Sequence, residues 1–470
     1  METVRNASAT GGAAAVERAL RATAARRPPG SRLPSVRALM KEHRVGPATV
    51  EAVLGRLARE GIVDPRPGEG TFVAAAAPPV VGDHGWQTLA LGAQLEWGAP
   101  TAGGIEGSDR SMIDLAADHP EAALQPRRLL ARAASRAAAE DRVWAPVDPA
   151  GRAELRAWFA GDIGAGLGAE DVVITAGRGA ALASLFTALA GDGADGGPSA
   201  VLVESPCAPF VLAVARMSGL RPVPVPTDHD GVRPEHLDAA FARSGARLAY
   251  LQPLLAEPSG ATLAVGRRAA VLEVAARHGA FLVEDDAARY LADPSAPAPL
   301  AATDPDGHVA HVRSLHQATA PGLGVAAVAA RGPLRRRLAA VVATQQLGAA
   351  PLAQAVALHT AGAAGWARHL RALRRELADR QQVLDEALAP LPVAGSRPAH
   401  GGLGRWVRLR DERDDLAVAA TLRRAGVALQ AGRPCFAGEA AGAYLRLSVG
   451  AAGPAELRRA TGLLASVLSA

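Results

Sequence analysis

The long C-terminal part of this 470-residue chain carries a few charged and polar residues that could bind a small molecule. Asp285 can pair with a cationic nitrogen, Arg446 can grip a carboxylate, and Arg178 stands where an expected helix begins, whose free amides favour anions. Such a set suits a zwitterionic or carboxylated ligand. The residues expected to form its binding site are Gly177, Arg178, Gly179, Asp285, His316, Gln317 and Arg446.

Each of these residues also has a purely structural interpretation. Arg446 could pair with a nearby carboxylate, Asp285 could cap backbone amides, and Arg178 could be solvated. His316 and Gln317 could be ordinary polar fillers. The sequence leaves both interpretations open.

The rest of the sequence indicates neither a metal centre nor a nucleophilic active site. The chain has a single lysine, Lys41, which lies far from the candidate residues, near the N-terminus. Cys207 and Cys435 lack the paired spacing of a zinc site or a disulfide framework. We find no Ser-His-Asp arrangement, phosphate-binding glycine loop or metal-spaced cluster. We therefore expect no metal.

The elements that must position the candidate residues alternate between strands and helices. Apolar runs at 171–174, 200–203, 248–251 and 281–283 predict strands, and helical stretches separate them. This alternation predicts an α/β fold with a largely parallel sheet and helices on both of its faces.

Length and composition predict how the chain is divided. At about 150 residues per domain, the length predicts about three lobes. We expect an N-terminal module over 1–76, a linker rich in Ala, Pro and Gly over 77–111, a large domain over 112–345, and a C-terminal helix with a small α+β domain over 346–470.

Basic charge is concentrated in the first of these regions. Residues 1–76 hold twelve Arg or Lys against seven Asp or Glu, an excess equal to the +5 of the whole chain. Such a module suits nucleic acid. The lone cysteines, and the lack of an apolar stretch of about 18 residues that could span a bilayer, predict a cytoplasmic protein without membrane contact.

The sequence of the N-terminal module predicts three helices followed by a hairpin. A first helix is expected over 13–26, Ser35 can cap a second helix from Val36, and Pro47 suits the first turn of a third. Gly61 ends that helix, and a turn over 66–70 joins two short strands.

The text LPSVRALMKEHRVGPATVEAVLGRLAREGIVDPRPGEGTFV resembles the winged helix-turn-helix of the GntR family. The resemblance implies binding to double-stranded operator DNA. Gly46 and Pro47 stand where a Ser-Arg pair usually opens the recognition helix, which weakens the usual base readout. The alternative is a protein–protein module. The residues implied at the DNA are Arg32, Ser35, Arg37, Thr49, Arg66, Gly68 and Gly70.

Seven short motifs in the remaining chain follow the order and spacing of fold-type I aminotransferases. Together with the GntR-like head, they resemble the MocR subfamily of transcription regulators, in which an aminotransferase-like body senses a small molecule. The resemblance implies a homodimer. The motifs are Asp148–Gly151 with Leu155-Arg156, Thr175–Gly177, Val203–Pro206, Pro258–Gly260, Glu284–Asp286, Ala320–Leu323 and Tyr444–Leu447.

The pyridoxal-phosphate site of that family is degenerate in this sequence. The Schiff-base lysine falls on Gln317, preceded by His316, and an amide cannot form a Schiff base. The phosphate-binding arginine falls on Gly324, and Glu257 falls near the expected ring hydroxyl. The three positions of the missing aromatic contacts are Pro146, Ala208 and Ala287.

Of the family's site, Asp285, the backbone amides around Gly177–Gly179 and Arg446 are retained. We therefore predict a regulator with a catalytically inactive sensing and dimerisation body, and pyridoxal phosphate only as a possible noncovalent ligand. The alternatives are an enzyme using noncovalent pyridoxal or pyridoxamine phosphate, and a structural partner protein that has also lost DNA binding.

Overall fold

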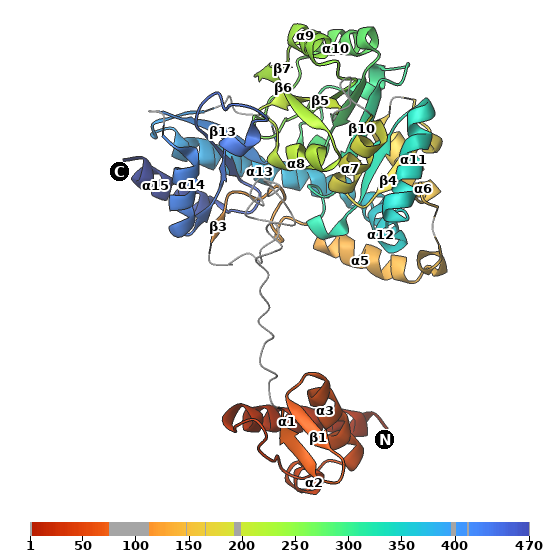
Figure 1. Cartoon of the computed structure of the whole chain (residues 1–470), viewed down its shortest axis with the longest axis vertical. Coiled ribbons are helices and arrows are strands. Elements are labelled where there is room, and N and C mark those ends of the chain that lie inside the picture. Colours follow the sequence, from red (N-terminus) through yellow and green to blue (C-terminus); the bar gives the residue numbers. More distant parts are fainter. Residues whose placement is uncertain are drawn as a thin grey trace. The chain divides into compact units, whose positions relative to one another are not determined.

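The computed structural model describes residues 2–74, 112–146, 148–164, 166–191, 199–395, 401–410 and 413–469. The chain divides into two compact units, residues 1–94 and 95–470, which are each described by themselves (Figure 1). The linker expected over 77–111 lies outside the described residues. Among the described residues, no helix is both long enough and apolar enough to cross a membrane.

The N-terminal unit has the predicted order of three helices and a hairpin. The Ser35 hydroxyl accepts a hydrogen bond of 3.3 Å from the amide of Ala38, which confirms the expected cap. Val16, Leu39 and Leu57 from the three helices meet in one buried core. The elements are α1 (Glu2–Arg26), α2 (Val36–His43), α3 (Pro47–Arg59), β1 (Val63–Arg66) and β2 (Gly70–Val73).

The second unit is built on an eight-stranded sheet in the order β4-β11-β10-β9-β8-β5-β6-β7. The five strands from β10 to β6 run parallel, whereas β11 is antiparallel to both neighbours and β7 is antiparallel to β6. The prediction of a largely parallel sheet is confirmed. The strands are β4 (Val172–Thr175), β5 (Ala200–Ser205), β6 (Arg221–Asp228), β7 (Gly231–Val232), β8 (Leu248–Leu251), β9 (Phe281–Asp285), β10 (Val309–Ser314) and β11 (Ala326–Ala329).

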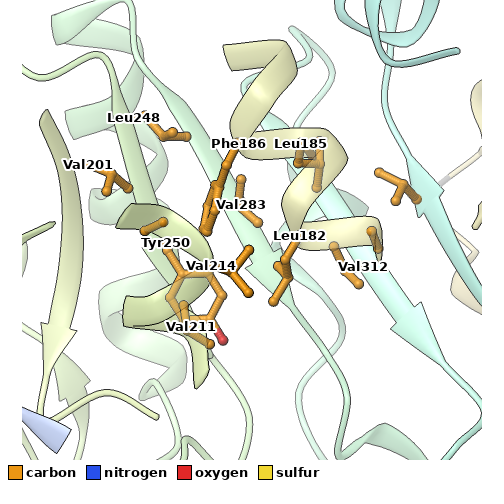
Figure 2. Close-up of a cluster of buried hydrophobic side chains, with 14 of the residues drawn as sticks. Leu182, Leu185, Phe186, Val201, Val211, Val214, Leu248, Tyr250, Val283 and Val312 are labelled. Atoms are coloured by element: carbon orange, nitrogen blue, oxygen red, sulfur yellow. The ribbon is translucent and has the colours of Figure 1, made fainter. Parts of the chain in front are cut away.

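Helices cover both faces of this sheet because successive strand residues point to opposite sides. Val201 and Val203 pack in the cluster drawn in Figure 2, whereas Leu202 packs in another cluster on the opposite face. The first cluster holds side chains of α7 (Arg178–Leu189), α8 (Pro209–Met217) and α11 (Gly332–Gln346). The second holds side chains of α9 (Pro234–Ser244) and α10 (Val265–His278).

Two further groups of elements complete the second unit. Beside β4, α6 (Ala153–Ile163) and α12 (Pro351–Ala361) share a core, and α5 (Arg127–Ala138) packs on α12. The C-terminal part has a four-stranded sheet in the order β12-β13-β16-β15. Its elements are α13 (Trp366–Leu388), β12 (Val393–Gly395), β13 (Gly404–Leu409), α14 (Asp415–Arg424), β14 (Val427–Ala428), which pairs with β3 (Ile113–Asp114), β15 (Gln430–Ala431), β16 (Tyr444–Ser448) and α15 (Pro454–Ser469).

Gly151 is required where the chain turns into α6. Its φ is +93°, and a Cβ there would lie 2.5 Å from the Cβ of Ile174 in β4. We expect Gly151→Ala to lower the stability of the second unit by more than about 2 kcal/mol, because the left-handed backbone and the overlap both oppose a side chain. The thermal unfolding midpoint measures this.

Gly161 provides the matched control, since it is an exposed helical glycine with no atom within 4 Å of a built Cβ. Gly161→Ala should leave the midpoint unchanged or raise it. Equal midpoints for the two variants would contradict the packing argument.

Candidate functional site

The candidate ligand site begins with a buried charge at the carboxyl end of β9. Asp285 is the last residue of that strand and is completely buried. Its Oδ2 accepts hydrogen bonds from Arg178 Nε at 2.7 Å and from the Tyr250 hydroxyl at 2.8 Å. Arg178 is the first residue of α7, and Tyr250 lies on the neighbouring strand β8.

Figure 2 shows the Tyr250 ring among the apolar side chains, with its phenolic oxygen away from Phe186. Burial raises the pKa of Tyr250 well above its usual value, and the Asp285 charge raises it further, so the hydroxyl remains a donor. Burial alone would lower the pKa of Arg178. The attraction of Asp285 outweighs it, and the pKa of Arg178 lies well above its ordinary value. The Arg178 guanidinium therefore stays charged beside Asp285.

A second ion pair continues the first toward the C-terminal sheet. Arg446 on β16 donates from Nη2 to Glu257 Oε1 at 3.0 Å and from Nη1 to the carbonyl of Ala116 at 3.2 Å. The other Glu257 oxygen, Oε2, lies 3.7 Å from Arg178 Nη1. Asp285, Arg178, Glu257 and Arg446 thus alternate in sign, and we call these four residues the ion chain.

Gln317 and His316 lie on the segment after β10. The Gln317 Nε2 donates to the carbonyl of Asp118 at 3.1 Å, while its Oε1 is buried and has no partner among the residues that the structure describes. Gln317 lines a cavity of about 20 Å³ together with Glu257 and Arg446. Burial lowers the pKa of His316, although Asp118 at 3.9 Å opposes this, so the imidazole is neutral at neutral pH.

The described residues do not fit pyridoxal phosphate. Asp285, which would face the cofactor's ring nitrogen, already holds the Arg178 guanidinium at 2.7 Å. Gln317 offers no amine, and Ala208 and Ala287 offer no ring to stack. The cavity of about 20 Å³ has room for about one water molecule. Pro146 stands at the third position where the family has an aromatic residue. It is exposed and offers no ring either.

The structure brings Arg178, Asp285, Gln317 and Arg446 together around the ion chain and its cavity. The interpretation of Arg178 as solvated is wrong, because it is 92% buried against Asp285. Asp285 pairs with side chains, so its interpretation as a backbone cap is also wrong. Arg446 does pair with a carboxylate, that of Glu257.

The two glycines of the site have backbone roles. Gly177 caps α7 with a φ of +94°, and a Cβ there would face the backbone of Gly324 at 3.6 Å. A Cβ at Gly179 would lie 3.1 Å from the Phe210 ring. Sequence reasoning missed Tyr250, although a tyrosine inside a strand predicted to be buried signals a hydroxyl that needs a partner.

In the N-terminal unit, several candidate DNA residues gather on the hairpin. Arg66 lies over the Phe72 ring at 4.6 Å and pairs with Asp64 at 2.9 Å. Gly68 and Gly70 form the turn with φ of +80° and +120°. Arg32 pairs with Phe72 in an isolated bridge, and its guanidinium packs against Gly70.

The other candidates lie on the two helices. Ser35 caps α2, Arg37 is exposed in its first turn, and Thr49 lies half-buried in the first turn of α3. The hairpin and the start of each helix therefore carry the predicted residues.

We expect Arg178→Met to destabilise the second unit by about 3–5 kcal/mol, because it leaves the Asp285 carboxylate buried without its cation. Arg178→Met combined with Asp285→Asn should recover part of this loss. Thermal and denaturant unfolding measure both. Arg277→Met, which removes an exposed pair with Asp238, is the control and should change little. An effect of Arg178→Met as small as that of the control would contradict the buried pair.

Comparison with known proteins agrees with both units. Residues 13–73 match the model for bacterial regulatory proteins of the gntR family, and residues 112–461 match aminotransferase class I and II. The chain is 29% identical to the HTH-type transcriptional regulator YjiR of Escherichia coli, over 86% of this chain and 87% of that protein. It is 28% identical to PtsJ of Salmonella typhimurium, a vitamin B6 salvage pathway transcriptional repressor, over 84% of each.

Among solved structures, the α-aminoadipate aminotransferase LysN from Thermus thermophilus superimposes with a TM-score of 0.71 at 25% identity, over 77% of this chain and 92% of that chain. The predicted resemblances are confirmed. The chain belongs to the class I and II aminotransferase family, and its GntR-type DNA-binding head gives it the architecture of the MocR-like transcription regulators.

Proposed function

We propose that this chain is a transcription regulator whose head binds operator DNA and whose body senses a small molecule without catalysing a reaction. The proposal that the body is not catalytic rests on one observation: the Arg178 guanidinium lies 2.7 Å from the Asp285 carboxylate. A catalytic body needs that carboxylate for its cofactor. Here the Arg178 guanidinium occupies Oδ2 of that carboxylate, while Oδ1 has no partner among the described residues.

The head supplies two kinds of contact. Arg32 and Arg66, with the open turn at Gly68 and Gly70, would follow the phosphate backbone, because guanidinium groups and bare backbone can approach phosphates closely. Arg37 and the Ser35 backbone region would do the same at the start of α2, and Thr49 would enter the major groove with α3. The two heads of a homodimer would then bind two half-sites of the operator DNA.

This assignment predicts salt-sensitive binding of the full chain to the DNA upstream of its own gene. Arg37→Ala and Arg66→Ala should each weaken binding to all sequences alike and reduce the slope of log affinity against log salt by about 1. Fluorescence anisotropy over a salt series measures this. Arg277→Ala, in the second unit, should leave the slope unchanged. Absence of salt-sensitive binding by the wild type would argue against a DNA-binding head.

The body, in this proposal, forms no Schiff base with pyridoxal phosphate. Its position for the lysine is Gln317, and the chain's only lysine is Lys41 in the head. The ion chain and the small cavity argue equally against the enzyme that binds its cofactor noncovalently. A small carboxylated or amino-acid-like effector is the ligand that Arg446 and its surroundings suit better.

Wild-type protein given excess pyridoxal phosphate should therefore show no borohydride-reducible absorbance that belongs to the body. Lys41→Arg removes the only side-chain amine and serves as the control for adventitious labelling of the head. Mass spectrometry of the reduced protein locates any adduct. A reducible adduct on the second unit would contradict the proposal.

An effector would act by favouring one arrangement of the two heads over another. The differential affinity required is about 1–3 kcal/mol, as in ordinary allosteric coupling. A protein that works on chromosomal DNA in this way acts in the cytoplasm.

A further inference from the structure

We propose that the second unit holds another ligand site, separate from the ion chain, which binds an arylalkylamine: a primary ammonium group on a short chain that carries an aromatic ring. The site is a cleft of about 890 Å³, and none of the four ion-chain residues lines it. The inference goes beyond the proposed function, because it depends neither on DNA binding nor on a ligand at Arg446.

The cleft lies at the carboxyl end of the large sheet, where the strand order changes direction. β5 has β6 on one side and β8, followed by β9, on the other side. In open sheets, ligands bind in crevices outside the carboxyl ends of the strands at such a point. Here Pro206 follows β5, Thr227 and Asp228 end β6, and Leu254 and Leu255 lie in the loop after β8.

The wall of the cleft suits an aromatic ring. Trp406 on β13 and Tyr444 on β16 line it, and their own rings stack with centroids 4.8 Å apart and planes inclined by 7°. The volume lies within the roughly 300–1,000 Å³ of pockets that bind organic molecules, and aromatic and aliphatic walls are usual in them. The aliphatic lining includes Leu254, Leu255, Ala261, Ala292 and Ala296.

The charged residues that line the cleft are acidic. Asp228 ends β6, Asp230 lies in the turn before β7, and Asp293 lies in the loop after β9. Within the described residues, the lining includes no Arg or Lys. A ligand phosphate or carboxylate would meet like charge here, whereas an ammonium group would be attracted. The cleft therefore favours a cationic ligand.

Asp230 is the carboxylate best placed to receive that cation. Arg267 donates to the two oxygens of Asp228 at 2.6 and 2.9 Å, which neutralises that carboxylate. The same guanidinium lies 4.0 Å from Asp230, beyond hydrogen-bond distance. His229 Nε2 lies 3.3 Å from Asp230, on an exposed side chain. A ligand ammonium group can therefore bind Asp230 without displacing an arginine.

The other charges near the cleft compensate one another. Asp293 accepts hydrogen bonds from the amide and hydroxyl of Ser295, and its charge acts on Arg374, which does not line the cleft. Three arginines behind the wall each have a carboxylate of their own. These pairs are Arg233 with Glu235, Arg268 with Glu284, and Arg289 with Asp286. One ammonium group therefore balances the charge that remains on Asp230.

A metal ion is the other cation that this turn could attract. Asp228, His229 and Asp230 bring possible ligand atoms within 4.8 Å of one another. Arg267 already occupies both oxygens of Asp228, so a metal ion would have to compete with a guanidinium. An ammonium group needs only Asp230, which favours the amine.

The test measures three indoles of similar size on the full-length protein by calorimetry. Tryptamine carries an ammonium group, indole-3-propionate carries a carboxylate in its place, and 3-propylindole is uncharged. Tryptamine should bind about tenfold more tightly than either of the others, because only its charge complements the lining. Butylamine, which has the ammonium group without the ring, should also bind more weakly than tryptamine.

Two variants test where tryptamine binds. Asp230→Asn should weaken tryptamine by about threefold to tenfold and leave 3-propylindole unchanged, because only the ammonium group loses its partner. Ala296→Trp fills the cleft and should abolish binding of both. Asp306→Asn removes the same charge from an exposed residue outside the lining, and it should change no affinity. Thermal unfolding verifies that each variant is folded.

The inference is overturned if tryptamine binds wild type no more tightly than indole-3-propionate does. It is also overturned if either Asp230→Asn or Ala296→Trp binds tryptamine as tightly as wild type, since the amine would then lie elsewhere. All these measurements are made without DNA, so their outcome is independent of whether the head binds an operator.

Discussion

The body of this protein depends on the neutralisation of one buried carboxylate. Asp285 is fully buried at the carboxyl end of β9, a middle strand of the sheet, and an isolated charge there would be strongly destabilising. Arg178 and Tyr250 supply the compensating cation and hydrogen bond from two neighbouring elements. In a relative that binds pyridoxal phosphate, a ring nitrogen could provide that compensation. Here the chain's own Arg178 and Tyr250 compensate Oδ2 of Asp285.

The alternation of residues along β9 explains why only one of three consecutive acids faces the pocket. Glu284 and Asp286 are directed to the other side, where Glu284 accepts from His311 and Asp286 accepts from Arg313. On that face of the sheet, these ionic contacts join the β9 segment to β10. Asp285 lies on the opposite face. The pleat therefore places this structural ionic network on the face of the sheet opposite to Asp285 and the candidate ligand site.

Much of the architecture could be predicted because it rests on local signals. The Ser35 cap, Pro47 at the first turn of α3 and the Gly68–Gly70 turn each act through their own backbone, so residue type and spacing are sufficient. The four predicted strands are present for a similar reason, since apolar runs between helical stretches pack between two layers of helices. The short and mixed strands β6, β7 and β11 carry weaker signals, and their pairing needs partners distant in the chain.

The sequence by itself determined which chemistry is missing: Gln317 has no amine, and Ala208 and Ala287 have no rings, whatever the fold. It also identified Asp285, Arg178 and Arg446 as candidates. Only the tertiary structure decided how they pair. Arg178 and Asp285 are 107 residues apart, and Arg446 and Glu257 are 189 apart. Whether a charged side chain faces solvent, a ligand or another side chain depends on sheet order and strand register, which long-range packing sets.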